Sequence, residues 1–181
     1  TRYERLWYQR CQLLMTLTDE DRAALHALVP EVPAFTNSAV ISARQLPAPI
    51  EPDTRSLWVG FGGQFGHPPN VEALVWLNEA LAPALAARCP GVRIAIAGRG
   101  ARQALAGTPH PALEWLGFVD DYDAFLRSCR VFLAPLRSGG GVKVKVLEAL
   151  ACGCPVVTTP IGAEGIALTA GEGLVVAQGV A

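Results

Sequence analysis

The amino-acid sequence predicts an α/β fold, a Rossmann-like, doubly wound parallel sheet that follows a short N-terminal appendage. From Ser56 onward, short and continuously apolar segments alternate with segments of helical periodicity. This pattern is typical of a parallel sheet that helices cover on both faces. Apolar residues make up 51% of the 181 residues and charged residues 17%, so the chain can bury a sizeable core. The first fifty residues lack this alternation.

The appendage is predicted to contain one strand, one helix and a linker. The strand is residues 12–18, QLLMTLT, and the helix follows over residues 18–29. Thr18 is a suitable N-cap, and three acidic residues in the next positions favour the first turn of a helix. Residues 33–55 contain four prolines and little periodicity, which is typical of a linker.

The alternating segment begins with a strand at residues 56–62 that ends in glycines, followed by a helix at residues 70–89. Leucines at helical spacing give this helix one apolar face, and Pro83 is expected to bend or break it. A second strand at residues 92–98 precedes a short helix at residues 101–105.

The second half of this segment continues the alternation. The strands expected are residues 113–119, 131–135, 155–159 and, more weakly, 173–177, and the helices are residues 120–129 and 143–152. In sheets of this type, ligands bind beyond the carboxyl ends of the strands. The loops that follow the strands are therefore where a site is expected, and two of them are rich in glycine.

Residues 136–148, LRSGGGVKVKVLE, combine the features of an anion site. Three consecutive glycines before a helix let backbone N–H groups approach an anion closely, and the helix dipole favours negative charge there. Lys143 and Lys145 add positive charge that suits phosphate. Glu148 shares a helix face with Lys145 and is placed to accept hydrogen bonds from ribose hydroxyls. The alternative is a turn followed by an exposed Lys145–Glu148 pair of little energetic value.

The loop after the first strand, VGFGGQFGHPP, partly matches a dinucleotide fingerprint. Phe65 occupies the third glycine position, and Pro68 and Pro69 are expected to delay the following helix, so a pyrophosphate would not meet its N-terminus. Arg99, after the second strand, could accept the 2′-phosphate of NADP, which keeps that alternative open. The favoured interpretation is that these glycines let the backbone approach a ligand or a second domain.

His67, beside these glycines, is a candidate contact for a ligand, although a structural or solvent-facing histidine is favoured. The five cysteines are scattered along the chain, which indicates reduced thiols rather than a disulfide framework. Cys152 and Cys154 flank a tight turn without a second Cys/His pair at ligand spacing. They are predicted to be small buried residues rather than a metal or redox pair.

The charge of the chain argues against long-range attraction to nucleic acid or an anionic membrane, and its hydropathy argues against a membrane-spanning helix. The formal net charge is −1, so no bulk field attracts nucleic acid or an anionic membrane. No segment approaches the roughly 18 consecutive apolar residues of a membrane-spanning helix. Because the chain begins at Thr1 and ends without an obvious closing helix, we expect it to be a piece of a longer protein.

Residues 55–167 resemble, in order, the carboxy-terminal, nucleotide-sugar-binding half of GT-B glycosyltransferases. The closest similarity is to the large retaining family that includes bacterial capsule and exopolysaccharide transferases. The most specific block is LEALACGCPVVTTPIGAEGI, at residues 147–166. By this resemblance, residues 1–50 are the end of the acceptor-binding domain plus the interdomain linker. Residues 55–181 are the donor-binding domain, truncated at its carboxy-terminal end.

The resemblance also implies roles for individual residues. Glu148 matches the acidic residue that binds the ribose, and Gly140 falls where many members carry a glutamate that contacts the donor sugar. The family's Arg and Lys phosphate pair near the first strand is missing, so Lys143 and Lys145 are the expected substitutes that stabilise the leaving diphosphate. The donor-binding residues implied are Gly62, Gly63, Arg99, Gly117, Phe118, Val119, Ser138, Gly139, Gly140, Gly141 and Glu148.

The activity implied is transfer of a hexosyl group from a nucleoside-diphosphate sugar to a glycan or lipid-linked acceptor, with retention and without a metal or cofactor. Preorganised donors would stabilise the departing anion. The acceptor would bind the mostly absent N-terminal domain, so the isolated chain is expected to be inactive. A cytoplasmic protein is implied, compatible with peripheral association at the inner face of the membrane. The alternatives are a non-catalytic nucleotide- or phosphosugar-binding module, an NADP-dependent oxidoreductase and a GT-B-fold epimerase.

Overall fold

The computed structural model describes residues 1–38, 55–168 and 173–179. Contacts between residues divide the chain into two compact units, residues 1–40 and residues 41–181. Most of the predicted linker, residues 39–54, lies outside the described residues. Each unit is described by itself.

The N-terminal unit consists of α1 (Arg2–Tyr8), β1 (Leu14–Thr16), α2 (Asp19–Leu28) and β2 (Ala34–Thr36). The strand and helix predicted around Thr18 are confirmed, and its hydroxyl accepts a hydrogen bond from the backbone N–H of Asp21 at 3.0 Å. Two elements were not predicted. β2, which pairs with β1 in parallel, lies in the segment predicted as linker, and α1 begins with a capping box formed by Thr1 and Glu4.

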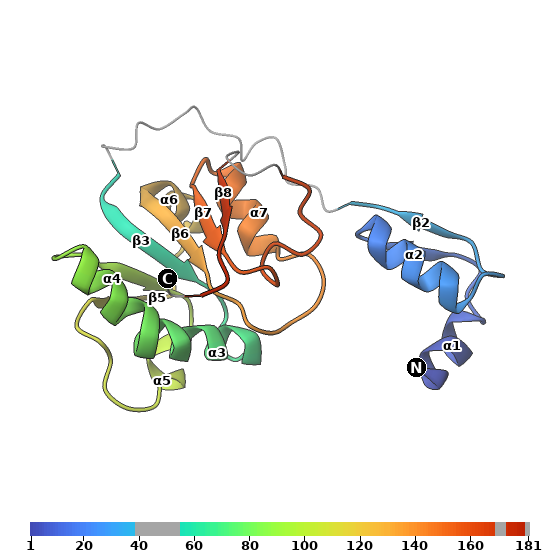
Figure 1. Ribbon diagram of the computed structural model, residues 1–181, viewed down its shortest axis with the longest axis horizontal. Coiled ribbons are helices and arrows are strands. Elements are labelled where there is room, and N and C mark those ends of the chain that lie inside the picture. Colours follow the sequence, from blue (N-terminus) through green and yellow to red (C-terminus); the bar gives the residue numbers. More distant parts are fainter. Residues whose placement is uncertain (39–54, 169–172, 180–181) are drawn as a thin grey trace. The chain divides into compact units, whose positions relative to one another are not determined.

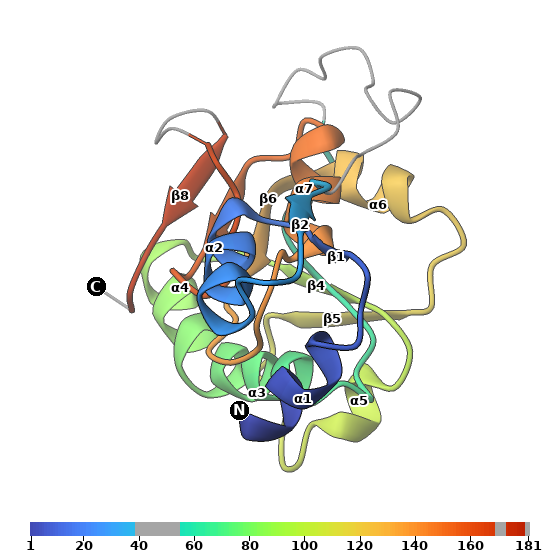
Figure 2. The same ribbon diagram turned by 90° about the vertical axis from the view of Figure 1, so that its right-hand side faces the viewer.

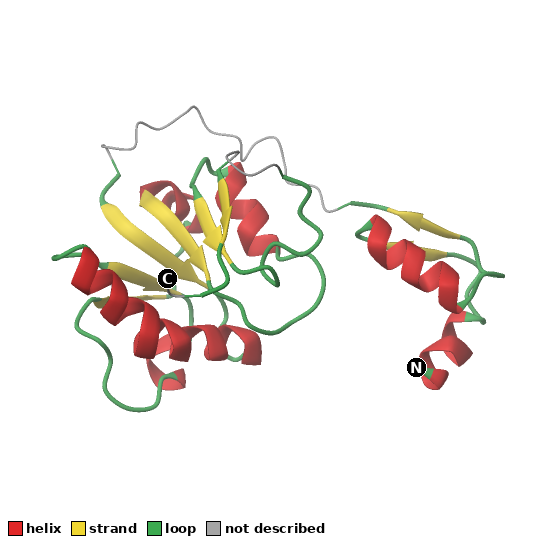
Figure 3. Ribbon diagram, in the orientation of Figure 1, coloured by secondary structure: helices red, strands yellow, loops and turns green. Residues whose placement is uncertain are grey.

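The main unit contains a parallel sheet with helices on both faces, as predicted (Figure 3). Its strands are β3 (Leu57–Gly62), β4 (Ile94–Ala97), β5 (Leu113–Gly117), β6 (Cys129–Ala134), β7 (Val156–Thr158) and β8 (Leu174–Val176). Its α-helices are α3 (Pro68–Trp76), α4 (Ala82–Arg88), α5 (Ala101–Ala104), α6 (Tyr122–Ser128) and α7 (Val144–Ala151). The order of the strands is β5-β4-β3-β6-β7-β8, and every pair is parallel.

The alternation of side chains along β4 separates two apolar cores. Ile94 and Ile96 pack on the face that α3 covers, whereas Ala95 and Ala97 pack on the face that α6 and α7 cover. Figures 1 and 2 show α3, α4 and α5 on one side of the sheet and α6 and α7 on the other. Because successive side chains of a strand point to opposite faces, a fully apolar strand such as β4 is explained by burial on both sides.

The topology creates a crevice at the carboxyl ends of β3 and β6. The chain runs outward from β3 through β4 to β5, and then returns to place β6 beside β3 on the other side. The loops that leave β3 and β6 therefore lead to helices on opposite faces of the sheet. Such a switch point is the usual ligand site of doubly wound sheets.

The helix after β3 begins earlier than predicted. Pro68 and Pro69 do not delay it but occupy its first positions, where the missing N–H groups would have no partner within the helix. The helix is not broken at Pro83 either. A π-helical turn, η3 (Leu77–Leu81), connects α3 to α4, and Pro83 lies in the first positions of α4. Such a turn can accommodate a proline, which has no backbone N–H group to donate.

Gly98 is predicted to be the glycine on which this fold depends most. It has φ +138°, and a Cβ atom at this position would overlap the carbonyl oxygen of Gly63. We expect Gly98→Ala to lower the free energy of unfolding by at least about 3 kcal/mol, as measured by urea denaturation. Gly66→Ala is the matched control, because a Cβ there would meet no atom within 4 Å. Similar stabilities of the two variants would contradict this prediction.

Candidate functional site

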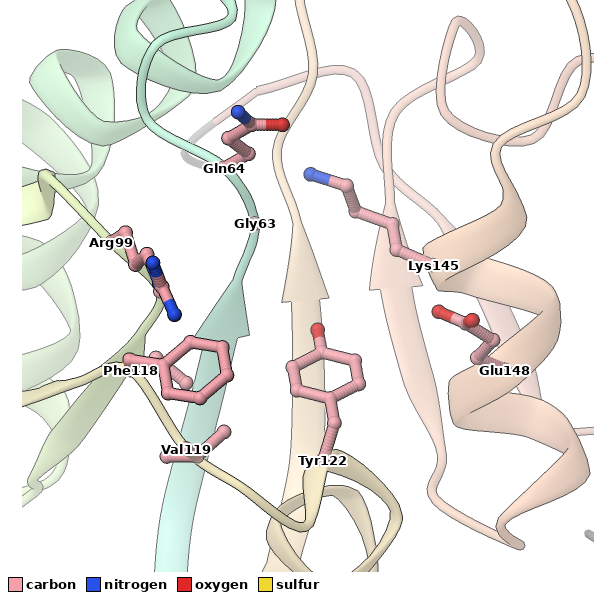
Figure 4. A pocket seen from close by; sticks show the side chains of 10 residues that line it. Gly63, Gln64, Arg99, Phe118, Val119, Tyr122, Lys145 and Glu148 are labelled. Atoms are coloured by element: carbon pink, nitrogen blue, oxygen red, sulfur yellow. The ribbon is translucent and has the colours of Figure 1, made fainter.

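A pocket of about 400 Å³ lies at the carboxyl ends of β3, β4 and β5 and against α7 (Figure 4). It is formed by the crevice between β3 and β6 and by the loops that follow three strands. Its lining residues are Gly63, Gln64, Ala97, Gly98, Arg99, Phe118, Val119, Tyr122, Lys145 and Glu148.

Helix α7 supplies the two charged side chains of the crevice. Val146 and Ala149 are fully buried against the sheet, which directs Lys145 and Glu148 into the pocket (Figure 4). The Lys145 Nζ atom donates a hydrogen bond to Asn70 Oδ1 and lies 5.5 Å from the centre of the Phe61 ring. Removal from water lowers the pKa of Lys145 to about 8, although Glu148 opposes this shift.

Glu148 and Tyr122 lie opposite one another across the crevice. Burial raises the pKa of Glu148, as does the charge of Asp123, whereas Lys145 lowers it. The Tyr122 hydroxyl points into the pocket (Figure 4), and burial followed by the charge of Glu148 raises its pKa. A Cβ atom on Gly62 would overlap this hydroxyl, so the last residue of β3 makes room for the tyrosine.

Arg99 and Phe118 form the opposite wall of the pocket. The guanidinium carbon of Arg99 lies 4.2 Å from the centre of the Phe118 ring (Figure 4), within the range of a cation–π contact. Phe118 is 58% exposed, because Gly117 ends β5 with φ +67° and turns the chain outward. The pair presents flat, exposed surfaces on which a planar ring can stack.

A second hollow of about 400 Å³ adjoins the first at Lys145. Its lining residues are His67, Pro69, Asn70, Leu136, Ser138, Gly139, Gly140, Val142, Lys143, Val144 and Lys145. The glycine-rich loop contributes its backbone here, with φ +102° at Gly139 and +72° at Gly141. Lys145 lines both hollows, so its amine lies where they join.

The two predicted lysines occupy different environments. Lys143 is the N-cap residue of α7, and its side chain is 10% exposed and lies 3.3 Å from a carboxylate oxygen of Glu164. It also donates to the carbonyl of Gly141, and it lines the second hollow. Lys145 has the neutral partner Asn70 instead. These are the only two lysines in the sequence.

Eight of the eleven predicted donor-binding residues line the two hollows, whereas Gly62, Gly117 and Gly141 line neither. The first contains Gly63, Arg99, Phe118, Val119 and Glu148, and the second contains Ser138, Gly139 and Gly140. Gly62 and Gly117 end β3 and β5, and Gly141 lies in the turn before α7. The Ser138 hydroxyl donates to a carboxylate oxygen of Glu72 at 2.6 Å.

Sequence reasoning missed three polar side chains that line the two hollows, those of Gln64, Asn70 and Tyr122. Tyr122 lies in the segment DDYD after the third predicted strand, and its place at a strand-to-helix junction was the available signal. Asn70 and Gln64 follow the glycines of the first loop. Their role depends on a contact with α7, 75 residues away from Asn70 along the chain, and no local pattern indicates it.

The two cysteines after α7 are small buried residues, as predicted. Cys152 and Cys154 are each 1% exposed, and burial raises the pKa of each thiol to about 11. Within residues 1–38, 55–168 and 173–179, no group of His, Cys, Asp and Glu side chains has a metal-binding arrangement. Over the same residues, no helix has the length and hydropathy to cross a membrane.

The sequence matches one family of enzymes over most of its length. The model of the family described as glycosyl transferases group 1 matches residues 56–181. Over 135 residues the chain is 28% identical to an uncharacterised 44.6 kDa protein in the cps region of Klebsiella pneumoniae, covering 70% of the chain and 35% of that protein. Over 117 residues it is 34% identical to a phosphatidyl-myo-inositol mannosyltransferase of Mycolicibacterium smegmatis, covering 62% and 30%. The chain thus spans about a third of the length of these relatives.

Solved structures share the fold at low sequence identity. Anabaena Alr3699/HepE in complex with UDP and glucose aligns with a TM-score of 0.71 and 15% identity, over 99% of this chain and 53% of that one. TarM aligns with a TM-score of 0.73 and 15% identity, over 99% of this chain and 36% of that one. At this identity the likeness establishes the fold alone.

The charge of Lys145 is predicted to reduce the stability of the chain. We expect Lys145→Met to raise the free energy of unfolding at pH 7 by about 1 to 2 kcal/mol, because the lysine loses water around a charge when the protein folds. The folded pKa of about 8 lies below the ordinary value of 10.5. The cost is therefore complete below pH 8 and disappears as the pH rises towards 10.5.

Urea denaturation of both proteins between pH 7 and pH 10 measures this effect. The difference in stability should shrink steadily as the pH rises from 8. If Lys145→Met is less stable than wild type at pH 7, or if its additional stability does not change with pH, burial of the charged amine does not destabilise the protein.

Proposed function

The chain belongs to the group 1 glycosyl transferases, and from this premise we propose that its main unit is the donor-binding domain of a GT-B glycosyltransferase. The full-length protein would transfer a hexosyl group from a nucleoside-diphosphate sugar to a glycan or lipid-linked acceptor. Transfer would retain the anomeric configuration and need no metal ion or cofactor. The observation that carries this proposal is the amine of Lys145 at the junction of two hollows.

The first hollow has the features of a nucleoside site. Phe118 and Arg99 offer surfaces against which a base can stack, and Val119 borders the same space. Glu148 lies deeper in the crevice, one helical turn after Lys145. A carboxylate accepts hydrogen bonds from two hydroxyl groups at once, so Glu148 is assigned to the ribose.

The second hollow is assigned to the sugar, and the junction to the diphosphate. A nucleoside in the first hollow would extend its phosphates towards Lys145, where the two hollows meet. Gly140 takes the place of the glutamate that many relatives use to contact the sugar, and a Cβ at Gly140 would meet no atom within 4 Å. The sugar hydroxyls would therefore meet Ser138 and backbone groups of the glycine-rich loop.

The proposed chemistry is electrostatic stabilisation of the leaving diphosphate. Bond breaking places negative charge on the departing phosphate, and a fixed cation in a site of low water content stabilises that charge strongly. Lys145 supplies this cation, and Lys143 lies at the start of the same helix. The dipole of α7 adds to the effect at its N-terminus. These groups account for departure of the diphosphate without a metal ion.

The known relatives support the donor and product classes. UDP-glucose and UDP are bound in structures of HepE, and the mycobacterial relative is named as a mannosyltransferase, which favours a hexose. The Klebsiella relative belongs to a cps region, which favours polysaccharide assembly. We assign residues 1–50 to the end of an acceptor-binding domain plus the interdomain linker. The full protein would act in the cytoplasm, at the inner face of the membrane where the acceptor is lipid-linked, and the isolated chain would not transfer sugar.

A second candidate is a nucleotide- or phosphosugar-binding module that has lost transferase activity. The observation that favours it is Gly140, where a sugar-contacting glutamate is expected. Both candidates bind a nucleoside diphosphate, so binding does not separate them. Sugar transfer by the full-length protein, measured with the donor that binds, distinguishes the two.

Isothermal titration calorimetry tests the donor site directly. In buffer containing EDTA, we expect the chain to bind one of UDP, GDP and ADP at least about tenfold more tightly than the corresponding nucleoside, and not to bind NADP. Lys145→Met should abolish the difference between diphosphate and nucleoside, because it removes only a phosphate contact. Binding that requires a divalent metal, or an equal loss for both ligands, would contradict the assigned role of Lys145.

Glu148 is predicted to recognise the ribose. The wild-type chain should prefer the ribonucleoside diphosphate to its 2′-deoxy analogue by about tenfold, and Glu148→Gln should reduce this preference because a neutral amide is a weaker acceptor. Competitive titration of the two nucleotides measures the ratio. Glu79→Gln changes an exposed carboxylate on η3 and should leave the ratio unchanged. A ratio that survives in Glu148→Gln would remove Glu148 from the ribose site.

A further inference from the structure

Asn70 is a buried polar residue that the assignments above leave without a role. It lies in the first turn of α3 and is 8% exposed. Burial of an amide is costly unless its donors and acceptors are paired. A hydrophobic residue would be the simpler choice for a helix that packs Ala73 and Leu74 into the core, so the polar side chain calls for an explanation.

Both ends of the Asn70 amide are hydrogen-bonded. Its Nδ2 atom donates to the carbonyl of Gln64 at 2.9 Å, and its Oδ1 atom accepts from Lys145 Nζ. An ammonium group only donates and a carbonyl only accepts, so the two partners determine which way the amide faces. Asn70 thus joins the loop after β3, the start of α3 and helix α7.

Gly63 shows how closely these segments meet. A Cβ atom at Gly63 would lie 2.9 Å from Asn70 Nδ2 and 3.0 Å from Lys145 Nζ. Only a glycine leaves space for the Asn70–Lys145 pair beside the strand. The loop, the amide and the amine are therefore packed as one unit at the junction of the two hollows.

The chemistry of the partner matters as much as its position. A carboxylate in place of the amide would hold the amine but also cancel its charge, which would weaken attraction for an anion. An amide oxygen fixes the amine by a hydrogen bond and leaves the charge of Lys145 available. Asn70 therefore suits a lysine whose charge is needed elsewhere.

We propose that Asn70 is the positioning residue of Lys145, holding the amine at the junction of the two hollows so that it meets the phosphate groups of the donor. The inference rests on the proposed function as far as the ligand is concerned. The hydrogen bond itself, and its effect on the amine, are properties of the chain without ligand.

Lysine-selective NMR tests the first half of this inference. Because Lys143 and Lys145 are the only lysines, a chain labelled with ¹³C-lysine gives signals from two side chains, and Lys143→Arg assigns them. Titration of the signals from pH 6 to pH 11 reports the pKa of Lys145. The comparison covers wild type, Asn70→Asp, Asn70→Leu and the control Asn78→Leu.

The expected order of the Lys145 pKa is Asn70→Asp, then wild type, then Asn70→Leu, from highest to lowest. A carboxylate favours the ammonium more than an amide does, and an apolar side chain favours it least. Asn78→Leu removes a comparable bond, in which Asn78 Oδ1 accepts from the backbone N–H of His110 at 2.7 Å, and should match wild type. The other ionisable groups around the pocket are the same in these four proteins: Glu148, Tyr122, Asp123, Arg99, His67 and Lys143.

Calorimetry with UDP, GDP and ADP, and with the corresponding nucleosides, tests the second half. At pH 7, Asn70→Leu should weaken binding of the preferred diphosphate at least about tenfold and leave nucleoside binding unchanged. Asn70→Asp should also weaken diphosphate binding, although its Lys145 pKa is the highest, because the carboxylate cancels the charge. If Asn70 served packing alone, Asn70→Asp would not raise the pKa of Lys145 and at the same time weaken diphosphate binding.

An unchanged Lys145 pKa in Asn70→Leu, or an equal change in Asn78→Leu, would overturn the inference. If Asn70→Leu does not fold, the comparison of Asn70→Asp with wild type decides, since the positioning role requires a higher pKa and weaker diphosphate binding. If wild type binds none of the three diphosphates, the proposed function fails. The NMR order would still decide whether Asn70 holds Lys145.

Discussion

The partly buried charge of Lys145 is the constraint on which the site depends. A cation held away from bulk water is costly, and the lowered pKa of its amine measures that cost. The surrounding groups reduce the cost only in part, through the hydrogen bond that Lys145 donates to Asn70, the face of the Phe61 ring and the carboxylate of Glu148. An anion bound at this position would stabilise the charge of Lys145 beyond what the surrounding groups of the protein achieve. Under the proposed function, the same charge that weakens the empty fold would be the source of affinity for a diphosphate.

The glycines around the crevice follow from this arrangement. Gly62 makes room for the Tyr122 hydroxyl, Gly63 for the Asn70–Lys145 pair, and Gly98 for the carbonyl of Gly63. Each of these glycines is explained by a neighbouring group of the protein, and none requires a bound dinucleotide. The helix after β3 begins with Pro68 and Pro69, which have no N–H groups to offer a pyrophosphate. A loop that resembles a dinucleotide fingerprint is thus explained by packing against side chains from α3, α6 and α7.

Periodicity was sufficient to predict the sheet and most helices, because burial on both faces imposes continuous apolar runs on β4 and its neighbours. The pairing of Lys145 and Glu148 on one face also followed from helical spacing. Asn70 and Tyr122 could not be predicted in the same way, since their roles arise where separate segments meet. The short strand β2 was missed because it begins a proline-rich segment with little periodicity, and α1 because none of its residues is buried, so it has no apolar stripe at helical spacing that packs into a core. Pro68 was misjudged because a proline can begin a helix as well as prevent one.

The choice of lysine rather than arginine at this junction has a physical reason. Lysine occurs only in α7 and at its N-cap, whereas arginine occurs throughout the rest of the sequence, so the two lysines are not a matter of overall composition. The ammonium is compact enough to fit between the Gly63 backbone and the Phe61 ring, where the planar guanidinium of arginine would need more space. It has three donors, and Asn70 engages one of them. Two are left for a ligand, and under the proposed function they would meet an oxygen from each phosphate of a diphosphate.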